Sequence, residues 1–403
     1  MAETGTQGLP EDRQPVIIAA RRTPVCRANG ILQSLRAHEL LAPVLRSLLD
    51  DAGVSPESVA DVVIGNAVGG GGNVARLAGL EAGLPVSVPG LTVDRQCGSG
   101  LDAIALASRL VAAGGGMYLA GGVESISTAP LRAHRNGAGE PEFFTRAQFA
   151  PAGYDDPDMG TAAENVAAHF RVGRARQDEF AMRSHQRAVA AAASGVFDAE
   201  IVPLTAGPAQ GGTPVAALVS DDDGPRRGLT AAVLARFPAA FVPGGTVTAG
   251  NSCFDADGAA AVVITSMERA RELGARDGLL VLGTDTTGVD PRLLGIGAAA
   301  AGERLLAAHG LAAADLGLVE FNEAFASQTI ACLERLGIDP VRANLDGGAL
   351  ALGHAYGASG AVLVTRLLAQ ARRAPVQGQL ALALISIAGG MGTAALLEYR
   401  TFD

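Results

Sequence analysis

The feature that most constrains the fold of this chain is a pattern that occurs twice. A Gly/Ser-rich turn leads into a helix, a strand follows, and the strand ends in two glycines. The first copy runs from Cys97 to Gly122 and the second from Gly353 to Gly390. Two copies of one supersecondary pattern indicate two similar halves related by a pseudo-two-fold axis. Such a duplication is expected to bring the two turns, and with them Cys97 and His354, to one central crevice.

Short apolar strands alternate with segments of helical periodicity in both halves. Residues 62–65 and 117–122 are predicted as buried strands, and residues 101–113 as a helix. This alternation predicts an α/β fold in which helices cover both faces of a parallel or mixed sheet. From residue 125 to about residue 245 the chain is more charged and less regular, which indicates an insertion over one end of the sheet.

Two stretches bear on the surroundings of the protein. Residues 380–397 carry no charge and approach the length of a membrane span, but Gly389, Gly390 and Gly392 interrupt them. Two buried strands joined by a glycine turn are therefore predicted instead. Residues 1–14 are polar and acidic, which predicts a disordered tail rather than a signal peptide. We expect a soluble, cytoplasmic protein without a membrane partner.

Composition excludes several classes of function. The net charge of -10 disfavours nucleic acid as a partner, and aromatic residues are only 4% of the chain. The four cysteines form no CxxC pair and no cluster with zinc-finger spacing, so no metal site is expected.

Cys97 lies in a turn directly before a predicted helix. Unpaired N–H groups and the macrodipole at a helix N-terminus favour the thiolate, and the following glycines are expected to let another molecule approach closely. This is the layout of an activated nucleophile. A small buried residue at a strand–helix turn is the alternative, because free cysteines are often buried.

From residue 15 on, the chain resembles the thiolase family, the acetyl-CoA acetyltransferases and 3-ketoacyl-CoA thiolases. Each motif alone is modest evidence, but their order along the chain is very specific. The motifs are DRQCGSG (94–100), AGGVESIS (120–127), MGTAAENVA (159–167), TVTAGN (246–251), DGAAA (257–261), NEAFA (322–326), GGALALGHAYGASG (347–360) and GGMG (389–392).

The resemblance implies a five-layered αβαβα fold of two pseudo-equivalent halves plus a loop domain that binds coenzyme A. The N-terminal half would comprise residues 15–125 and 250–277, the loop domain 126–249, and the C-terminal half 278–403. A homodimer or homotetramer is also implied. No tightly bound cofactor is expected, since coenzyme A enters as the thioester substrate; a carrier protein is the alternative acyl donor.

The resemblance also implies roles for individual residues. Cys97 would take the acyl group from a thioester. His354 would activate that thiol or point a ring N–H at the thioester oxygen. Asn322 would hold a water or donate to the same oxyanion. The backbone N–H groups of Cys97 and Ala388 would form a second oxyanion hole.

Further residues are expected to contact the substrate. Arg226 and Arg227 would meet the phosphates or adenine of coenzyme A, unless they are simply a solvated basic pair. Met159 and Phe325 would line the acyl and pantetheine channel, or belong to the core. The loop that often reads N-A-S-G in the family is also assigned to substrate binding, and here it contains Asn251, Cys253 and Phe254.

The chain departs from the family at its C-terminal motif. Ser386 replaces the cysteine that moves the proton at the α-carbon of the substrate, and Ala388 replaces the first glycine. An alcohol is a far weaker acid than a thiol, so this change is expected to slow Claisen chemistry by about 10²–10⁴-fold.

The favoured function is that of a thiolase-type acyltransferase. Cys97 takes an acyl group from an acyl-CoA, and a carbon–carbon bond is formed or cleaved at a 3-ketoacyl thioester. Because of Ser386, one alternative is transfer of the acyl group to an amine, an alcohol, water or another acceptor that needs no Claisen step. The other alternative is a non-catalytic partner subunit with the same fold.

Overall fold

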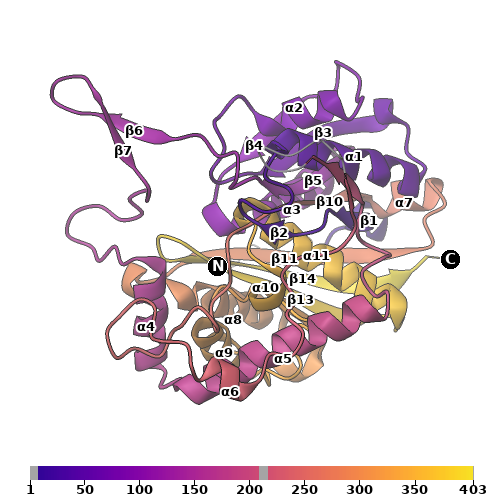
Figure 1. Ribbon diagram of the computed structural model, residues 1–403. Helices are drawn as coiled ribbons and strands as arrows, with labels where there is room; N and C mark the ends of the chain where they lie inside the picture. The colour runs from indigo at the N-terminus through magenta and orange to yellow at the C-terminus, as the bar shows by residue number, and fades with distance from the viewer. Residues whose placement is uncertain (1–7, 208–216, 403) are drawn as a thin grey trace.

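The computed structural model describes residues 8–207 and 217–402. The main strands form one ten-stranded mixed sheet that bends into two layers (Figure 1). In spatial order these strands are β12 (Leu316–Phe321), β13 (Gln379–Ile387), β14 (Met391–Thr401), β11 (Asp277–Gly288), β1 (Pro15–Arg22), β10 (Ala256–Ser266), β5 (Met117–Glu124), β3 (Val59–Gly65) and β4 (Gly90–Val93), with β2 (Cys26–Arg27) paired to β10. The pairs Val16–Leu280 and Ile17–Leu279 between β1 and β11 join the two layers.

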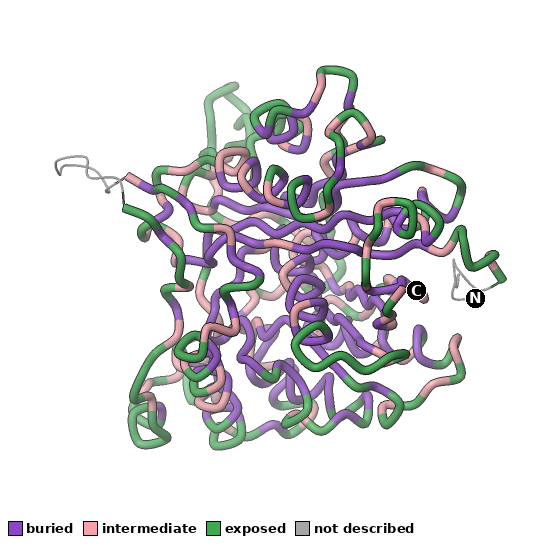
Figure 2. The backbone as a smooth tube through the Cα atoms, turned by 90° about the vertical axis from the view of Figure 1, so that its right-hand side faces the viewer, coloured by how far each residue is buried: buried purple, intermediate pink, exposed green. Residues whose placement is uncertain are grey.

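Helices complete the other three layers. α3 (Ser99–Ala112) and α11 (Tyr356–Arg373) lie between the two halves of the sheet and share one apolar core with both of them. α1 (Ala37–Ala52) and α2 (Val74–Glu81) cover the outer face of the N-terminal half. α8 (Gly297–His309) and α9 (Ala326–Arg335) cover that of the C-terminal half. The order α, β, α, β, α confirms the predicted five-layered fold, and Figure 2 shows its buried interior.

The two central helices begin against each other because their first turns contain glycine. A Cβ on Gly100 would lie 2.5 Å from the carbonyl oxygen of Gly357, and one on Gly360 would lie 2.6 Å from the backbone nitrogen of Leu101. Any side chain at these positions would push the helices apart, since a packed interior has no free volume there. This contact brings the turn of Cys97 and the turn of His354 together.

The uncharged stretch 380–397 forms the antiparallel hairpin of β13 and β14, as predicted. Gly389 and Gly390 lie in its turn, both with φ of 82°, a conformation that costs glycine little. Among the described residues, no helix has the length and apolar character needed to cross a membrane.

Between β5 and β10 the chain leaves the sheet, and the predicted loop domain falls in this segment. The hairpin of β6 (Arg132–Arg135) and β7 (Pro141–Phe144) projects away from the body in Figure 1. The other described elements here are α4 (Met159–His169), α5 (Arg174–Ala193), β8 (Leu204–Ala206), β9 (Ala217–Val219) and α6 (Ala231–Leu234). The helices α7 (Met267–Glu272) and α10 (Ala349–Leu352) belong to the two halves.

Buried ion pairs tie this insertion to both halves. Arg22 on β1 pairs with Glu200 (2.8 Å) and Asp222 (2.7 Å), both from the insertion. Arg366 on α11 pairs with the same Glu200 (2.6 Å) and with Asp346 (2.7 Å). Because the two guanidinium groups are almost fully buried, loss of one partner would leave a charge uncompensated, at a cost of about 3–5 kcal/mol.

The N-terminal segment differs from its prediction. Residues 1–7 of the predicted disordered tail lie outside the described residues, but Glu11–Arg13 form a short 3₁₀ helix. Arg271 pairs with Glu11 (2.5 Å) and Asp12 (2.9 Å), and Arg13 donates to the carbonyl of Ala112 (2.8 Å). These partners lie far away in the sequence, so the local composition gave no sign of them.

Candidate active site

Cys97 lies in a tight turn, Gln96–Gly98, directly before α3. Gln96 has a φ of 47°, in the left-handed region that residues other than glycine seldom adopt. The Ser99 hydroxyl holds the turn, because it accepts a hydrogen bond from the Arg95 N–H (2.8 Å) and donates to the Gln96 carbonyl (2.6 Å). Backbone strain of this kind gathers at functional sites, where the surrounding structure maintains it.

The Cys97 thiol ionises less easily than its place before a helix predicts. Burial raises the pKa of Cys97 to about 12, and the charges of Glu124 and Asp255 act in the same direction. The backbone N–H groups of Ala388 and Cys97 reach the sulfur and lower its pKa, but they do not offset burial. The expectation of an easily ionised thiol is therefore corrected: removal from water outweighs the start of the helix.

The glycines after Cys97 also have a different use from the one expected. A Cβ on Gly98 would lie 2.4 Å from the Ile387 side chain, and Gly100 packs against Gly357. Both glycines therefore allow the C-terminal half of the chain, rather than a ligand, to approach the nucleophile turn.

A cavity of about 430 Å³ opens onto Cys97. It brings together residues from both halves and from the insertion. Of the predicted site residues, those that line it are Cys97, Met159, Cys253, Phe325, His354, Ser386 and Ala388. The two turns of the duplicated pattern thus meet in one crevice.

His354 is 4% exposed and lines this cavity. Its Nδ1 lies 2.6 Å from the Ser359 hydroxyl, while its Nε2 is buried without a hydrogen-bond partner among the described residues. Burial lowers the pKa of His354 to about 4. The imidazole is therefore neutral near pH 7. When Nδ1 donates its proton to Ser359, Nε2 is free to accept one.

Glu124 connects the loop after β3 to the turn of His354. Its carboxylate accepts hydrogen bonds from the Asn66 side chain (2.7 Å) and from the backbone N–H groups of Ala67 (3.0 Å), Val68 (3.2 Å) and Gly357 (3.0 Å). Burial nevertheless raises the pKa of Glu124 to about 7. Gly357 follows His354 by three residues, so its hydrogen bond to Glu124 holds the turn that carries the His354 ring. We therefore assign Glu124 the role of positioning His354. Sequence reasoning did not single it out.

Asn322 lines a neighbouring small cavity of about 20 Å³ instead of the one that holds Cys97. Its side chain is 2% exposed, and its Nδ2 has no hydrogen-bond partner among the described residues. Ser359, the partner of His354, lines the same small cavity. A volume of this size is close to the minimum that holds one water. A buried amide nitrogen beside such a cavity agrees with the predicted water-holding role of Asn322.

The Ser386 hydroxyl is held on both sides. It donates to the Gly295 carbonyl (2.7 Å) and accepts from the Ala298 N–H (3.1 Å). The residue is 8% exposed at the wall of the Cys97 cavity. These bonds fix the hydroxyl against the start of α8.

A second cavity of about 390 Å³ adjoins the first, and Phe241, Ser252 and Cys253 line both. The predicted residues Arg226 and Phe254 line this second cavity, whereas Arg227 lines neither.

Two basic residues of the second cavity were missed in the sequence, Arg27 and His185. The Arg27 guanidinium stacks over the Phe254 ring at 3.8 Å. Burial and the charges of Arg226 and Arg27 lower the pKa of His185 to about 4. Burial and Arg226 also lower the pKa of Arg27. Positive groups are therefore crowded together here, which an anion would relieve.

The predicted substrate residue Asn251 lies in neither cavity. It is fully buried, where its side chain accepts from the Thr248 N–H (2.8 Å) and donates to Asp178 (2.9 Å). Its hydrogen bonds hold the loop that carries Cys253 from the side that faces away from the cavity. On the cavity side of the same loop, sequence reasoning missed the Asp255 carboxylate, which accepts a hydrogen bond from the Tyr356 hydroxyl (2.6 Å).

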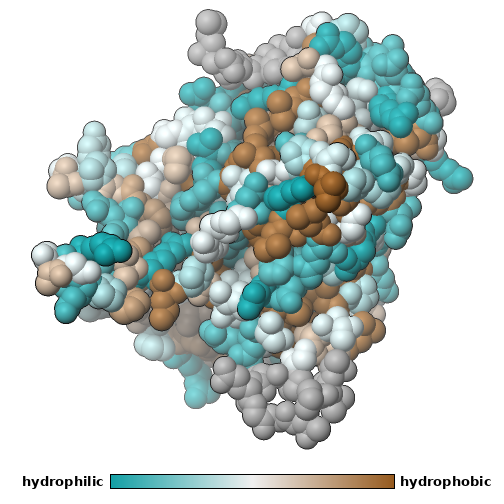
Figure 3. Space-filling view, turned by 90° about the horizontal axis from the view of Figure 1, so that it is seen from above, coloured by the Kyte–Doolittle hydropathy of each residue, from teal (hydrophilic) through white to brown (hydrophobic). Residues whose placement is uncertain are grey.

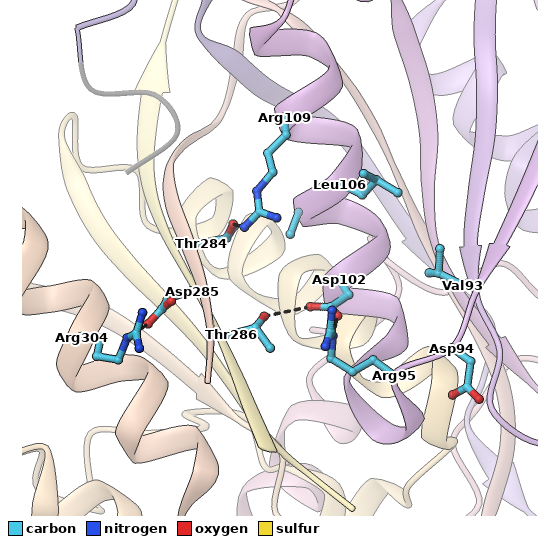
Figure 4. Close-up of a pocket in the computed structure, with 11 residues that line it drawn as sticks. Val93, Asp94, Arg95, Asp102, Leu106, Arg109, Thr284, Asp285, Thr286 and Arg304 are labelled. Carbon is cyan, nitrogen blue, oxygen red and sulfur yellow. Dashed lines mark hydrogen bonds and ion pairs between the residues drawn. The ribbon is translucent and has the colours of Figure 1, made fainter. Parts of the chain in front are cut away.

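A third cavity, of about 630 Å³, lies between α3 and β11 (Figure 4). Four of its charged side chains form ion pairs, Arg95 with Asp102 and Arg304 with Asp285 (2.8 Å). Although it is larger, it contains neither Cys97 nor His354. We therefore place the chemistry in the cavity of Cys97.

The site can now be compared with those of known proteins. The sequence matches the model of the thiolase N-terminal domain over residues 15–268 and that of the thiolase C-terminal domain over residues 280–399. The chain belongs to the thiolase family. This membership confirms the predicted family and the prediction of an acyltransferase enzyme.

Relatives of this thiolase cover nearly its whole length. A Staphylococcus haemolyticus protein, provisionally named acetyl-CoA C-acetyltransferase VraB, is 44% identical over 96% of the chain and 99% of the relative. The Bacillus subtilis protein provisionally named acetyl-CoA C-acetyltransferase YhfS is 42% identical over 95% and 98%. The crystal structure of the Bacillus anthracis acetyl-CoA acetyltransferase superposes with a TM-score of 0.87 at 34% identity, over 96% of this chain and 98% of that one.

Alkylation by iodoacetamide of the His354→Ala variant, in which the Cys97 proton can leave only to hydroxide, is expected to accelerate about tenfold per pH unit between pH 7 and 9. The pKa of Cys97 lies above this window, so the reactive thiolate fraction grows in proportion to hydroxide. The measurement is the rate of mass increase at Cys97, located by peptide mapping. A rate that is flat across the window would show a preformed thiolate and contradict the burial argument.

Proposed function

We propose that this thiolase transfers acyl groups through Cys97 and forms or cleaves a carbon–carbon bond at a 3-ketoacyl thioester. The observation that supports the proposal is the cavity that holds Cys97 together with Nε2 of His354, an atom that has no hydrogen-bond partner within the described part of the chain. A nucleophile, a neutral base and a backbone donor, the Ala388 N–H on the sulfur, converge there. These are the parts that nucleophilic acyl transfer needs.

Acylation begins when the Cys97 thiol gives its proton to Nε2 of His354. The sulfur attacks the carbonyl carbon of the thioester, and the protonated ring then donates Nε2–H to the developing oxyanion. When the thiolate of coenzyme A departs, it takes this proton, and the acyl group remains on Cys97. The lowered pKa of His354 suits the first step, because the ring is already neutral.

The adjoining cavity supports coenzyme A as the acyl carrier. Arg27 and Arg226 line its wall beside His185, and the crowding of the two guanidinium groups favours the phosphate groups of an acyl-CoA. The acyl end would then reach Cys97 past Phe241 and Cys253, which line both cavities.

The surface also fits the predicted homodimer or homotetramer. β4 is an edge strand of the sheet, and an unpaired edge with apolar side chains favours association. Leu77, Val86 and Leu91, on and between α2 and β4, are 46%, 83% and 40% exposed. The view from above shows apolar side chains gathered between polar ones on this face (Figure 3).

Intact-mass measurement tests the proposed function. After incubation with acetyl-CoA, we expect the protein to gain the mass of one acetyl group at Cys97, and coenzyme A to release it. Thiolysis of acetoacetyl-CoA by coenzyme A is then expected to yield two acetyl-CoA. An acyl-enzyme without thiolysis would favour the non-Claisen acceptor instead. If the protein forms no acetyl adduct and shows no thiolysis, the result would favour the alternative of a non-catalytic partner subunit.

A further inference from the structure

We propose that the Cys253 thiol, rather than the Ser386 hydroxyl, carries the proton to and from the α-carbon of the substrate. This assignment rests on the proposed function. It accounts for how the chain performs Claisen chemistry although serine occupies the place of the second cysteine.

Cys253 lies where the bond to be broken would pass. It is one of three residues that line both the Cys97 cavity and the adjoining basic cavity, together with Phe241 and Ser252. A substrate with its acyl end at Cys97 and its phosphates in the basic cavity must pass this junction, and its α-carbon is bonded directly to the carbon that Cys97 attacks. Of the three side chains, only the Cys253 thiol has an acidity suited to proton transfer.

The position of Cys253 is fixed by the neighbouring NEAFA segment. Its backbone N–H donates to the Ala324 carbonyl (2.9 Å), and Ser252 forms an isolated antiparallel bridge with Phe325. The sulfur lies close enough to Cys97 that a thiolate at Cys97 would raise the pKa of Cys253. Within residues 8–207 and 217–402, the Cys253 thiol hydrogen is donated to no acceptor.

Ser386 is less suited to the task. Its proton already lies in the hydrogen bond to the Gly295 carbonyl, and its oxygen accepts from the Ala298 N–H. Taking that proton away would create a buried alkoxide facing a carbonyl oxygen, which is a costly arrangement. The Cys253 thiol, by contrast, donates its proton to no acceptor among the residues that the structure describes.

The groups around Cys253 keep it protonated at rest. Burial raises the pKa of Cys253, and the charges of Asp255 and Cys97 raise it further. The Asp255 carboxylate is occupied by the Tyr356 hydroxyl (2.6 Å). His354, 4% exposed, completes the cavity with its unpartnered Nε2. The site thus offers one base and two thiols. The reaction needs these three groups, because one proton passes from Cys97 to His354 and a second passes from Cys253 to the α-carbon.

In the cleavage direction the protons balance as follows. Cys97 gives its proton to His354, and its sulfur attacks the 3-keto carbon. The bond between C2 and C3 breaks, its electron pair stays on C2, and Cys253 protonates C2 to release the shorter acyl-CoA. The Cys253 thiolate takes the proton of an incoming coenzyme A, whose sulfur attacks the acyl group on Cys97. Cys97 departs as a thiolate and recovers its proton from His354.

Loss of deuterium from methyl-deuterated acetyl-CoA in water isolates the α-carbon step from acyl transfer. We expect Cys253→Ala and Cys253→Ser to lower this exchange, and thiolysis of acetoacetyl-CoA, by about 10²-fold or more. In both variants Cys97 still gains the acetyl mass. Cys26→Ala is the matched control, since Cys26 is a fully buried thiol that lines neither cavity and is expected to keep both reactions.

The outcomes separate this assignment from the proposed function. Full exchange in Cys253→Ala would overturn it, and so would restored exchange in Cys253→Ser, because serine keeps the packing and removes the acidity. Loss of exchange in Ser386→Ala but not in Cys253→Ala would assign the proton to Ser386. If Cys97 of the unaltered protein gains no acyl mass, the proposed function itself fails.

Discussion

Cys97→Ala is expected to lower thiolysis of acetoacetyl-CoA by at least about 10⁴-fold, the order of loss seen when a covalent nucleophile is removed. The reason lies in the geometry of one turn. The left-handed Gln96 and the Ser99 hydrogen bonds hold the Cys97 sulfur where the Ala388 N–H reaches it. No other side chain of the cavity occupies that position. The rate of acetyl-CoA release, followed together with intact mass, is the measurement.

The variant is also expected to stay folded, which makes the result decisive. Alanine differs from cysteine by one sulfur atom, and that atom faces a cavity rather than the tightest packing of the core. Thermal unfolding of the variant within a few degrees of the parent would exclude a folding defect. Full turnover by a folded Cys97→Ala protein would disprove an acyl-enzyme at Cys97.

Much of the fold follows from local sequence pattern. The alternation of strands and helices predicts the sheet, and the glycines that interrupt residues 380–397 predict the β13–β14 hairpin instead of a membrane span. The duplicated turns predict that Cys97 and His354 share a crevice. These inferences succeed because periodicity and turn chemistry act over a few residues, within reach of a single stretch of sequence.

The environment of the site is set by contacts between distant segments, so local pattern does not reveal it. The helix start predicts a lowered pKa for Cys97, yet burial between the two halves raises it to about 12. Arg27 and His185 are more than 150 residues apart and meet only in the folded protein. The motif predicts that Asn251 contacts the substrate, but its side chain instead bonds Thr248 and Asp178 on the side of the loop away from the cavity. A motif identifies the segment; the side of that segment that faces the cavity depends on packing.

Ser386 shows the same limit in another form. Comparison of motifs predicts that a cysteine is missing at this position, because motifs are compared along one stretch of sequence at a time. The cavity, however, is assembled from several loops, and Cys253 reaches it from a segment more than 130 residues earlier. A proton-transfer group that is missing at one position can therefore be supplied by a residue from another loop of the same cavity. For this reason the proton at the α-carbon is assigned by position in the cavity rather than by alignment with the motif.

His354→Ala is expected to lower the rate of Cys97 acylation by acetyl-CoA by about 10²–10⁴-fold, the range of general acid–base catalysis. Without the ring, the Cys97 proton has no neutral imidazole to receive it, and the pKa of about 12 leaves very little thiolate near pH 7. The rate of acetyl-mass gain should therefore rise about tenfold per pH unit above pH 7 in the variant, as hydroxide replaces the base. In the unaltered protein, His354 is neutral well below this range, because its pKa is lowered to about 4, so acylation should depend on pH less steeply. Ser359→Ala, which removes only the partner of Nδ1, is the graded control with a smaller loss. Identical pH slopes in the His354→Ala variant and the unaltered protein would show that His354 does not take the proton.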